Sequence, residues 1–351
     1  MIIEQIRPSD MLANEAQDDA VLRVEDLSID LAGKTGALKA INDVNFSIRP
    51  GETLALVGES GSGKSLTSLS VLQLLPKTLK TGQGSKIRFR SKDGNFHDLA
   101  TASPRVMRSI RGRDIGIVFQ EPSSSLNPVQ RVGEQIAEPI RVHMGLSSRA
   151  AWKRAEELLA HVGIPDAPRR ALQYPHEFSG GMSQRATIAM ALACDPVMLI
   201  ADEPTTALDV TTQAQILDLM QSLQRERQMA MLFVTHNFAV VAQIAHRVAV
   251  MYSGYVVEYG RVDQVFAHPR HPYTAGLLAC VAREGEALAL RREGKHLPTI
   301  SGSVPSIANR PQGCPFAPRC PLAIDACRAQ VPPLEVTDEG NISRCIRWKE
   351  L

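Results

Sequence analysis

The fold of this chain is decided by one stretch, Thr53-Leu54-Ala55-Leu56-Val57-Gly58-Glu59-Ser60-Gly61-Ser62-Gly63-Lys64-Ser65. The apolar run predicts a strand, and the octet after it is a phosphate-binding loop in its expected context. Its glycines let successive backbone N–H groups curl around phosphate oxygens, and the loop leads into a helix whose N-terminus favours an anion. We expect Lys64 to reach the β- and γ-phosphates and Ser65 to bind Mg²⁺ through its hydroxyl. The helix should cover residues 66–75 and stop at Pro76.

Two further motifs follow in chain order. Phe178-Ser179-Gly180-Gly181-Met182-Ser183-Gln184-Arg185 opens a helical run over residues 186–194. A serine hydroxyl and glycine N–H groups at a helix N-terminus form an anion site, although alone they could be an ordinary N-cap. The apolar run 197–201 predicts a strand that is buried on both faces, with Asp202 and Glu203 at its end. Ligands bind at the carboxyl ends of such strands.

With these motifs in this order, the chain resembles the ATP-binding subunit of an ABC transporter, from about Val21 to its C-terminus. The resemblance implies that Asp202 organises Mg²⁺ and that Glu203 is the general base that polarises the attacking water. It also implies that the Ser-Gly-Gly segment contacts the γ-phosphate of an ATP held in the loop of a partner subunit. The residues given that role are Ser179, Gly180 and Gly181.

Three smaller elements extend the resemblance. Gln120, in Ile117-Val118-Phe119-Gln120, matches a glutamine that contacts Mg²⁺ and senses the membrane partner. Asp209 matches the loop that faces the partner's nucleotide, and His236 matches the histidine that contacts the γ-phosphate. The implied catalytic residues are therefore Glu203, His236 and Gln120, and the implied Mg²⁺ ligands are Ser65, Gln120 and Asp202. One expected residue is missing, because Leu31 stands where the family usually stacks the adenine on an aromatic ring.

Composition agrees with a conventional folded protein. The chain has 351 residues, 44% hydrophobic residues and a net charge of +2, which gives enough apolar surface for a core and argues against general nucleic-acid binding. The longest apolar runs are of strand length, so no membrane-spanning helix is expected. The polar residues near the N-terminus predict no secretory signal, and we expect the protein in the cytosol.

Alternating strand and helix patterns predict an α/β fold. Residues 1–20 are expected to be a flexible arm, and residues 21–265 an ABC-type nucleotide-binding domain. A helical subdomain is predicted at about 105–185, between Gln120 and the Ser-Gly-Gly segment, and the resemblance assigns it to contact with membrane-spanning subunits. Residues 266–351 are predicted to be a proline-rich, loop-rich extension.

The C-terminal extension indicates which branch of the ABC transporter family the chain resembles. His268-Pro269-Arg270-His271-Pro272-Tyr273-Thr274-Ala275-Gly276-Leu277-Leu278 resembles the C-terminal extension of oligopeptide and dipeptide importers. Four of the six cysteines follow it, separated by five, six and seventeen residues: Cys314, Cys320, Cys327 and Cys345. Disulfides are disfavoured in the cytosol, so the residues themselves leave zinc, an iron–sulfur cluster or free thiols open. The importer resemblance implies a 4Fe-4S cluster on these four positions.

The function implied by the resemblance is hydrolysis of ATP to power import of di- and oligopeptides. The implied partners are a second, related ATPase subunit, two transmembrane permease subunits and a periplasmic or extracellular solute-binding protein. The expected place is the cytoplasmic face of the bacterial inner membrane. An importer of nickel, opines or glutathione-like solutes is the alternative. A soluble ABC ATPase is disfavoured, since the sequence has one phosphate loop and no sustained heptad repeat.

Overall fold

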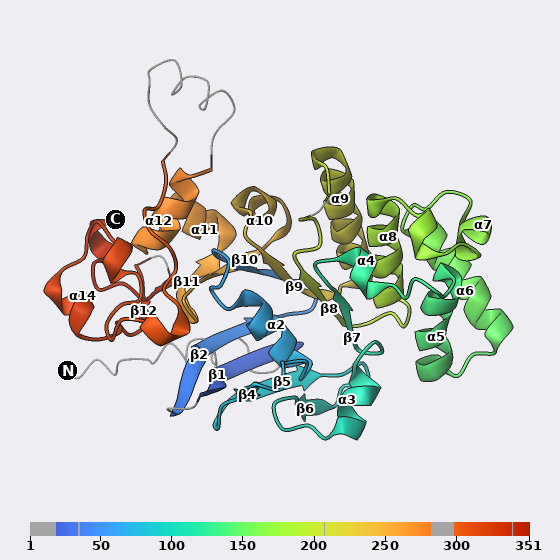
Figure 1. Ribbon diagram of the computed structural model, residues 1–351, viewed down its shortest axis with the longest axis horizontal. Helices are drawn as coiled ribbons and strands as arrows, with labels where there is room; N and C mark the ends of the chain where they lie inside the picture. Colours follow the sequence, from blue (N-terminus) through green and yellow to red (C-terminus); the bar gives the residue numbers. More distant parts are fainter. Residues whose placement is uncertain (1–18, 34–35, 207, 282–297, 339) are drawn as a thin grey trace, which may run out of the picture.

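The computed structural model describes residues 19–33, 36–206, 208–281, 298–338 and 340–351 (Figure 1). The predicted arm at residues 1–20 lies outside these ranges, apart from its last two residues. Among the described residues, no helix combines the length and the apolar character that crossing a membrane requires.

An eight-stranded sheet forms the centre of the molecule, in the order β12-β13-β11-β10-β3-β9-β8-β7. Neighbouring strands from β10 to β7 run parallel, whereas β11, β13 and β12 add antiparallel at the other edge. The bounds are β12 (Glu335–Val336), β13 (Ile342–Ser343), β11 (Tyr255–Arg261), β10 (Arg247–Tyr252), β3 (Thr53–Val57), β9 (Ala230–Thr235), β8 (Met198–Asp202) and β7 (Ile115–Val118).

A second, antiparallel sheet packs against the first, in the order β2-β1-β5-β6, with β4 paired to β1. Apolar side chains of both sheets share one buried cluster, which includes Phe46, Phe89 and Leu232. The bounds are β1 (Leu22–Gly33), β2 (Gly36–Ile48), β4 (Leu79–Thr81), β5 (Lys86–Arg90) and β6 (Phe96–Asp98).

Helices cover the larger sheet and form a group at one end of the molecule, on the right in Figure 1. That group packs α5, α6, α7 and α8 on one another and α4 on α8. The bounds are α2 (Lys64–Val71), α3 (Pro104–Ile110), α4 (Pro122–Ser125), α5 (Val132–Met144), α6 (Ser148–His161), α7 (Ala167–Ala171), α8 (Gly180–Ala191), α9 (Val210–Arg227), α10 (Phe238–Ile244), α11 (Val262–Ala267), α12 (Pro272–Ala279) and α14 (Asp325–Ala329). Short 3₁₀ turns are η1 (Pro175–Glu177), η2 (Ile307–Asn309), η3 (Ala317–Arg319) and η4 (Trp348–Glu350).

The parallel strands are apolar because both of their faces are covered. Every residue of β3, β8 and β9 is buried. Side chains alternate between the faces of a strand, so Leu232 and Val234 of β9 pack toward the antiparallel sheet while Phe233 packs on the helical side. The predicted α/β fold with a buried strand before the phosphate loop is confirmed.

The helix after the phosphate loop is shorter than predicted. It ends at Val71 rather than near Leu75, so Pro76 does not stop it. Gln73 adopts a left-handed backbone with φ of 50°, and its side-chain amide donates to the carbonyl oxygens of Leu99 at 2.7 Å and Ala102 at 3.0 Å. The tertiary contact of one glutamine therefore turns the chain out of the helix.

The C-terminal segment is joined to the central sheet. β13 pairs with β11 through Glu258 opposite Ser343 and Tyr259 opposite Ile342. Phe316 packs against Tyr252 at the end of β10 and against Tyr273 of α12, with ring centroids 5.2 and 5.3 Å apart. The loop-rich segment thus lies beside the end of β10, the neighbour of the strand that leads into the phosphate loop.

Candidate active site

The phosphate loop is held by hydrogen bonds from its own lysine, Lys64. The buried Lys64 ammonium donates to the carbonyl oxygens of Gly58 at 2.8 Å and Glu59 at 3.1 Å. Burial lowers the pKa of Lys64, and the nearby carboxylates of Glu203 and Asp202 oppose that shift. Gly61 and Gly63 have φ of +79° and +106°, which side chains rarely adopt. The loop residues Gly58 to Ser65 therefore form one continuous turn into α2.

Ser65 and Asp202 meet beside this loop. The Ser65 hydroxyl lies 3.2 Å from Oδ1 of Asp202, which ends strand β8. Burial raises the pKa of Asp202, and the Ser65 hydrogen bond acts against that rise. A hydroxyl and a carboxylate side by side are the oxygen donors that Mg²⁺ takes alongside phosphate. These two residues fit the predicted ion.

Two of the three predicted catalytic side chains, Gln120 and His236, contact the third, Glu203. Gln120 donates to Glu203 Oε2 at 3.3 Å, and His236 Nδ1 lies 3.2 Å from Oε1. Thr206, which the sequence reasoning did not select, donates its hydroxyl to Oε2 at 2.9 Å. Glu203 itself has a strained φ of 48°, and its N–H donates to the carbonyl of Val234 in the neighbouring strand. The ends of β7, β8 and β9 therefore bring Gln120, Glu203 and His236 together.

The Ser-Gly-Gly segment lies on a different part of the molecule. Ser179 is the N-cap of α8, its exposed hydroxyl accepting from the N–H of Met182 at 3.3 Å. α8 packs against α4, α5 and α6, whereas α2 contacts β8 and β9 (Figure 1). Gly180 is exposed, and a Cβ on Gly181 would lie 2.7 Å from the Thr212 methyl group. These residues are not gathered with the phosphate loop of the same chain.

Asp209 is also exposed and caps α9. Its carboxylate accepts from the N–H of Thr212 at 2.9 Å, and that bond lowers the pKa of Asp209.

Leu31, the position without the expected aromatic ring, is half-buried in β1 opposite Leu38 and Leu79. Neither cross-strand partner of Leu31 supplies an aromatic ring.

The C-terminal segment contributes contacts that sequence reasoning missed. Arg319 forms a bidentate ion pair with Glu59 of the phosphate loop, at 2.6 and 3.0 Å. The Tyr273 hydroxyl accepts the N–H of Glu59 at 2.8 Å. Arg319 and Glu59 are 260 positions apart, and no motif links them. The only sequence signal was the importer-like segment around Tyr273.

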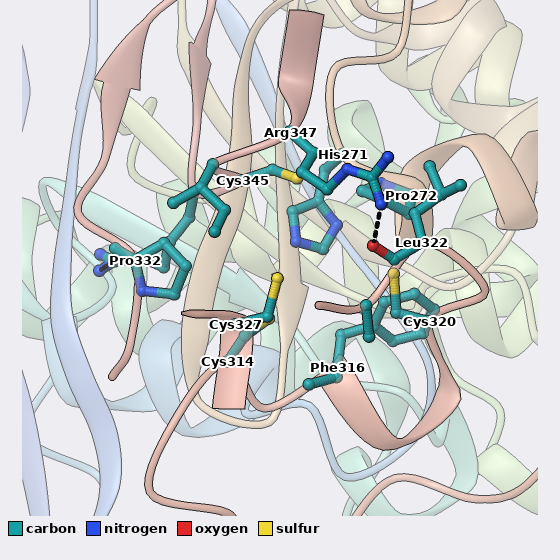
Figure 2. A pocket seen from close by; sticks show the side chains of 14 residues that line it. His271, Pro272, Cys314, Phe316, Cys320, Leu322, Cys327, Pro332, Cys345 and Arg347 are labelled. Atoms are coloured by element: carbon teal, nitrogen blue, oxygen red, sulfur yellow. Dashed lines mark hydrogen bonds between the residues drawn. The ribbon is translucent and has the colours of Figure 1, made fainter. Parts of the chain in front are cut away.

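The four C-terminal cysteines line one pocket together with His271 (Figure 2). Burial raises the pKa values of Cys314 and Cys320, and raises that of Cys345 to about 12. Burial also lowers the pKa of His271 to about 3, so the imidazole is neutral. Its Nδ1 accepts the N–H of Tyr273.

The four thiols of this pocket can be compared with the ligands of a single metal ion and of an iron–sulfur cluster. Within the described ranges, no three His, Cys, Asp or Glu side chains are placed to hold a single metal ion. Four thiols around one pocket nevertheless match the ligands of a cluster, whose iron atoms take one thiolate each. The free volume is about 20 Å³, so side chains would have to move outward to admit it.

Comparisons with known proteins agree with this geometry. The ABC transporter family profile matches residues 41–206, and the profile of the oligopeptide/dipeptide transporter C-terminal region matches residues 257–327. A putative peptide import ATP-binding protein of Brucella abortus (strain 2308) is 59% identical over 94% of this chain and 98% of its own length. The oligopeptide transport ATP-binding protein OppD of Salmonella typhimurium is 44% identical over 94% of each chain.

Solved structures show the same fold. cbiO1 from Clostridium perfringens, part of the ABC transporter complex cbiONQ, has a TM-score of 0.60 and 28% identity, covering 79% of this chain and 98% of its own. The dimeric ATP-binding cassette MJ0796, bound to ADP and phosphate, has a TM-score of 0.59 and 27% identity, covering 69% and 98%. The chain therefore belongs to the ABC transporter family, in the branch of ATP-binding proteins that carry the oligopeptide/dipeptide transporter C-terminal region.

Proposed function

We propose that this chain hydrolyses ATP to drive import of di- and oligopeptides, as the ATP-binding subunit of an ABC transporter. The observation that carries the hydrolytic part is the convergence of Gln120, His236 and Thr206 on Glu203, beside Lys64. A carboxylate held in place next to a phosphate-binding lysine can orient a water for attack on the phosphate and accept its proton.

Each side chain has a stated role in this proposal. The loop N–H groups and Lys64 hold the phosphates, and Ser65, Gln120 and Asp202 would hold Mg²⁺, which when bound neutralises phosphate charge. Glu203 orients the attacking water and accepts its proton. Gln120 and His236 hold the Glu203 carboxylate, so the base is fixed before ATP arrives.

We further propose that the active form contains a second, related ATPase subunit. Ser179, Gly180 and Asp209 are exposed and Gly181 is partly exposed, so this surface can contact a nucleotide held in the partner's loop, which supports the proposal. ATP would then close the pair by bridging the two chains, and hydrolysis would reopen it. The division into a nucleotide-binding domain at 21–265, a helical subdomain at about 105–185 and an extension at 266–351 belongs to the same proposal.

The remaining partners are two permease subunits and an external solute-binding protein, with this chain on the cytoplasmic face of the inner membrane. Val129, between α4 and α5, and Val142 of α5 are 79% and 70% exposed, and these apolar side chains support a contact of the helical group with the permeases. The names of the relatives support a peptide substrate. Uptake of a labelled dipeptide by cells that carry or lack this chain tests that part.

The role of Glu203 is tested by Glu203→Gln in the assembled transporter. The amide keeps the size of the side chain but cannot accept the proton, so ATP binding should persist while steady-state hydrolysis falls about 100-fold or more. Glu157→Gln is the matched control, because Glu157 is an exposed residue of α6 paired with Lys153. Hydrolysis in Glu203→Gln at the rate of the control would remove Glu203 from the role of base.

We also propose that Cys314, Cys320, Cys327 and Cys345 hold a 4Fe-4S cluster, with zinc as the alternative. The shared pocket and the four-thiol donor set support the proposal. Iron, zinc and acid-labile sulfide should be measured after anaerobic purification of the wild type, Cys320→Ser and, as control, Cys280→Ser. About four irons per chain, lost only in Cys320→Ser, would support the cluster. Zinc alone or no metal would refute it.

A further inference from the structure

A cation from the C-terminal segment is attached to the phosphate loop. The Arg319 guanidinium donates through Nη1 to Glu59 Oε2 at 2.6 Å and through Nη2 to Oε1 at 3.0 Å. Such a fork-to-carboxylate pair has two parallel bonds and is among the stronger ion-pair geometries. Glu59 is the second residue of the loop that begins at Gly58, so the pair acts directly on the candidate ATP site.

The cation is held in place by its own surroundings. The Arg319 side chain is only 5% exposed. Its Nε donates to the carbonyl of Ser301 at 2.8 Å, and Nη2 also donates to the carbonyl of Ile300 at 3.2 Å. Nη1 donates to the Tyr252 hydroxyl at 3.3 Å, and the guanidinium lies over the rings of Tyr252 and Phe316. Arg319 is therefore positioned before any nucleotide binds.

Glu59 puts a negative charge in the loop that would hold phosphate. Its carbonyl accepts the Lys64 ammonium and its N–H is taken by the Tyr273 hydroxyl, so the backbone of Glu59 is part of the loop. Its carboxylate is a third exposed and lies close enough to influence the charge of Lys64. A free carboxylate at this place would repel the phosphates, and partial burial would weaken the screening of that repulsion by water.

We propose that Arg319 is a positioning residue for ATP binding, which neutralises Glu59 and holds its carboxylate away from the phosphates. The proposal rests on the proposed role of residues 58–65 as the ATP-binding loop. Residues 41–206, which match the ABC transporter profile, contain Glu59 but not Arg319. The C-terminal segment therefore completes the charge balance of a loop that the cassette alone would leave with an unpaired acid.

The test is the affinity of the full-length chain for Mg-ADP, measured by titration calorimetry. Arg319→Met removes the charge but keeps an apolar stem, and should weaken binding about ten-fold. Glu59→Gln should tighten binding, because the repelling charge is gone while Arg319 remains. The double variant should bind within about two-fold of wild type, since both the acid at position 59 and the cation at position 319 are then gone. Arg261→Met is the matched control, because Arg261 forms a bidentate pair with exposed Asp263.

Three outcomes would overturn the proposal. Arg319→Met could bind Mg-ADP as tightly as Arg261→Met. Glu59→Gln could bind as weakly as Arg319→Met, or the double variant could fail to recover affinity. Either of the last two would mean that the pair serves only as a mechanical anchor. Lys64→Ala separates these results from a failure of the proposed function, because unchanged affinity in that variant would show that ADP binds elsewhere.

Discussion

Replacing Gly254 by alanine should destabilise the chain and disturb the phosphate loop from outside it. Gly254 follows β10 with φ of +81°, and a Cβ there would lie 2.1 Å from the carbonyl oxygen of Ala40 in β2. Its N–H donates to the carbonyl of Ser62 at 2.8 Å, and its own carbonyl accepts the N–H of Asn42 at 2.8 Å. A shift at Gly254 therefore moves the loop and β2 together.

Gly61 provides a matched control for the size of this effect. Its φ of +79° is almost the same as that of Gly254, but a Cβ on Gly61 would have no atom within 4 Å. The left-handed backbone costs alanine about 1–2 kcal/mol at either position. Overlap with a backbone carbonyl adds about 1–3 kcal/mol at Gly254, as overpacking typically does. We expect the free energy of unfolding to fall by about 1–2 kcal/mol in Gly61→Ala and about 2–5 kcal/mol in Gly254→Ala.

The assay is urea unfolding of the full-length chain without nucleotide, followed by circular dichroism. Omitting nucleotide matters, because an added methyl group in the loop could change phosphate binding and so shift apparent stability by mass action. Any effect of alanine on the unfolded chain is common to both variants and cancels in their difference. Equal losses in the two variants would refute the steric argument.

Three further substitutions probe buried polar groups. Burial raises the pKa of Glu258 from 4.5 to about 7, so the folded chain binds this proton more tightly than the unfolded chain and loses stability as pH rises from about 4.5 to about 7. Glu258→Gln lacks this proton and should gain stability relative to wild type by about 1.4 kcal/mol per pH unit in that range, with no further change above it. Unfolding curves at about pH 5 and about pH 8 measure the gain. Asp202→Asn should stabilise the nucleotide-free chain, because burial raises the pKa of Asp202, but should abolish the Mg²⁺-dependent part of ATP affinity; lower stability or unchanged affinity would contradict this. Tyr273→Phe should cost about 1–2 kcal/mol, because it leaves the N–H of Glu59 without its acceptor, and a thermal scan that matches wild type would count against that contact.

Local patterns predicted the core elements well. The strand at 53–57 has the predicted bounds, and the strand predicted at 197–201 is β8, at Met198–Asp202. Such strands can be recognised in the sequence because a strand buried on both faces must be apolar throughout. The helix after the loop was predicted too long, since a contact of Gln73 with a distant segment ends it.

The candidate site was predictable where motifs end strands. Asp202 ends one parallel strand, Glu203 follows it and His236 follows the neighbouring strand, and carboxyl ends of parallel strands meet at one edge. Thr206 lies three residues after Glu203 in the sequence, but its hydrogen bond to Glu203 depends on how the turn after β8 folds. The spacing of residues in the sequence does not determine the conformation of that turn.

By itself, the sequence determined that this chain has a phosphate loop between a buried strand and a helix, followed by an acidic pair at a strand end. Those features are written in short segments, where glycine freedom and apolar periodicity act over a few residues. Only the tertiary structure decided that Arg319 and Tyr273 contact Glu59, and that the N–H of Gly254 donates to the carbonyl of Ser62. The reason is that each of these contacts joins segments distant in sequence, whose meeting depends on the packing of the C-terminal segment and of β10 against the loop.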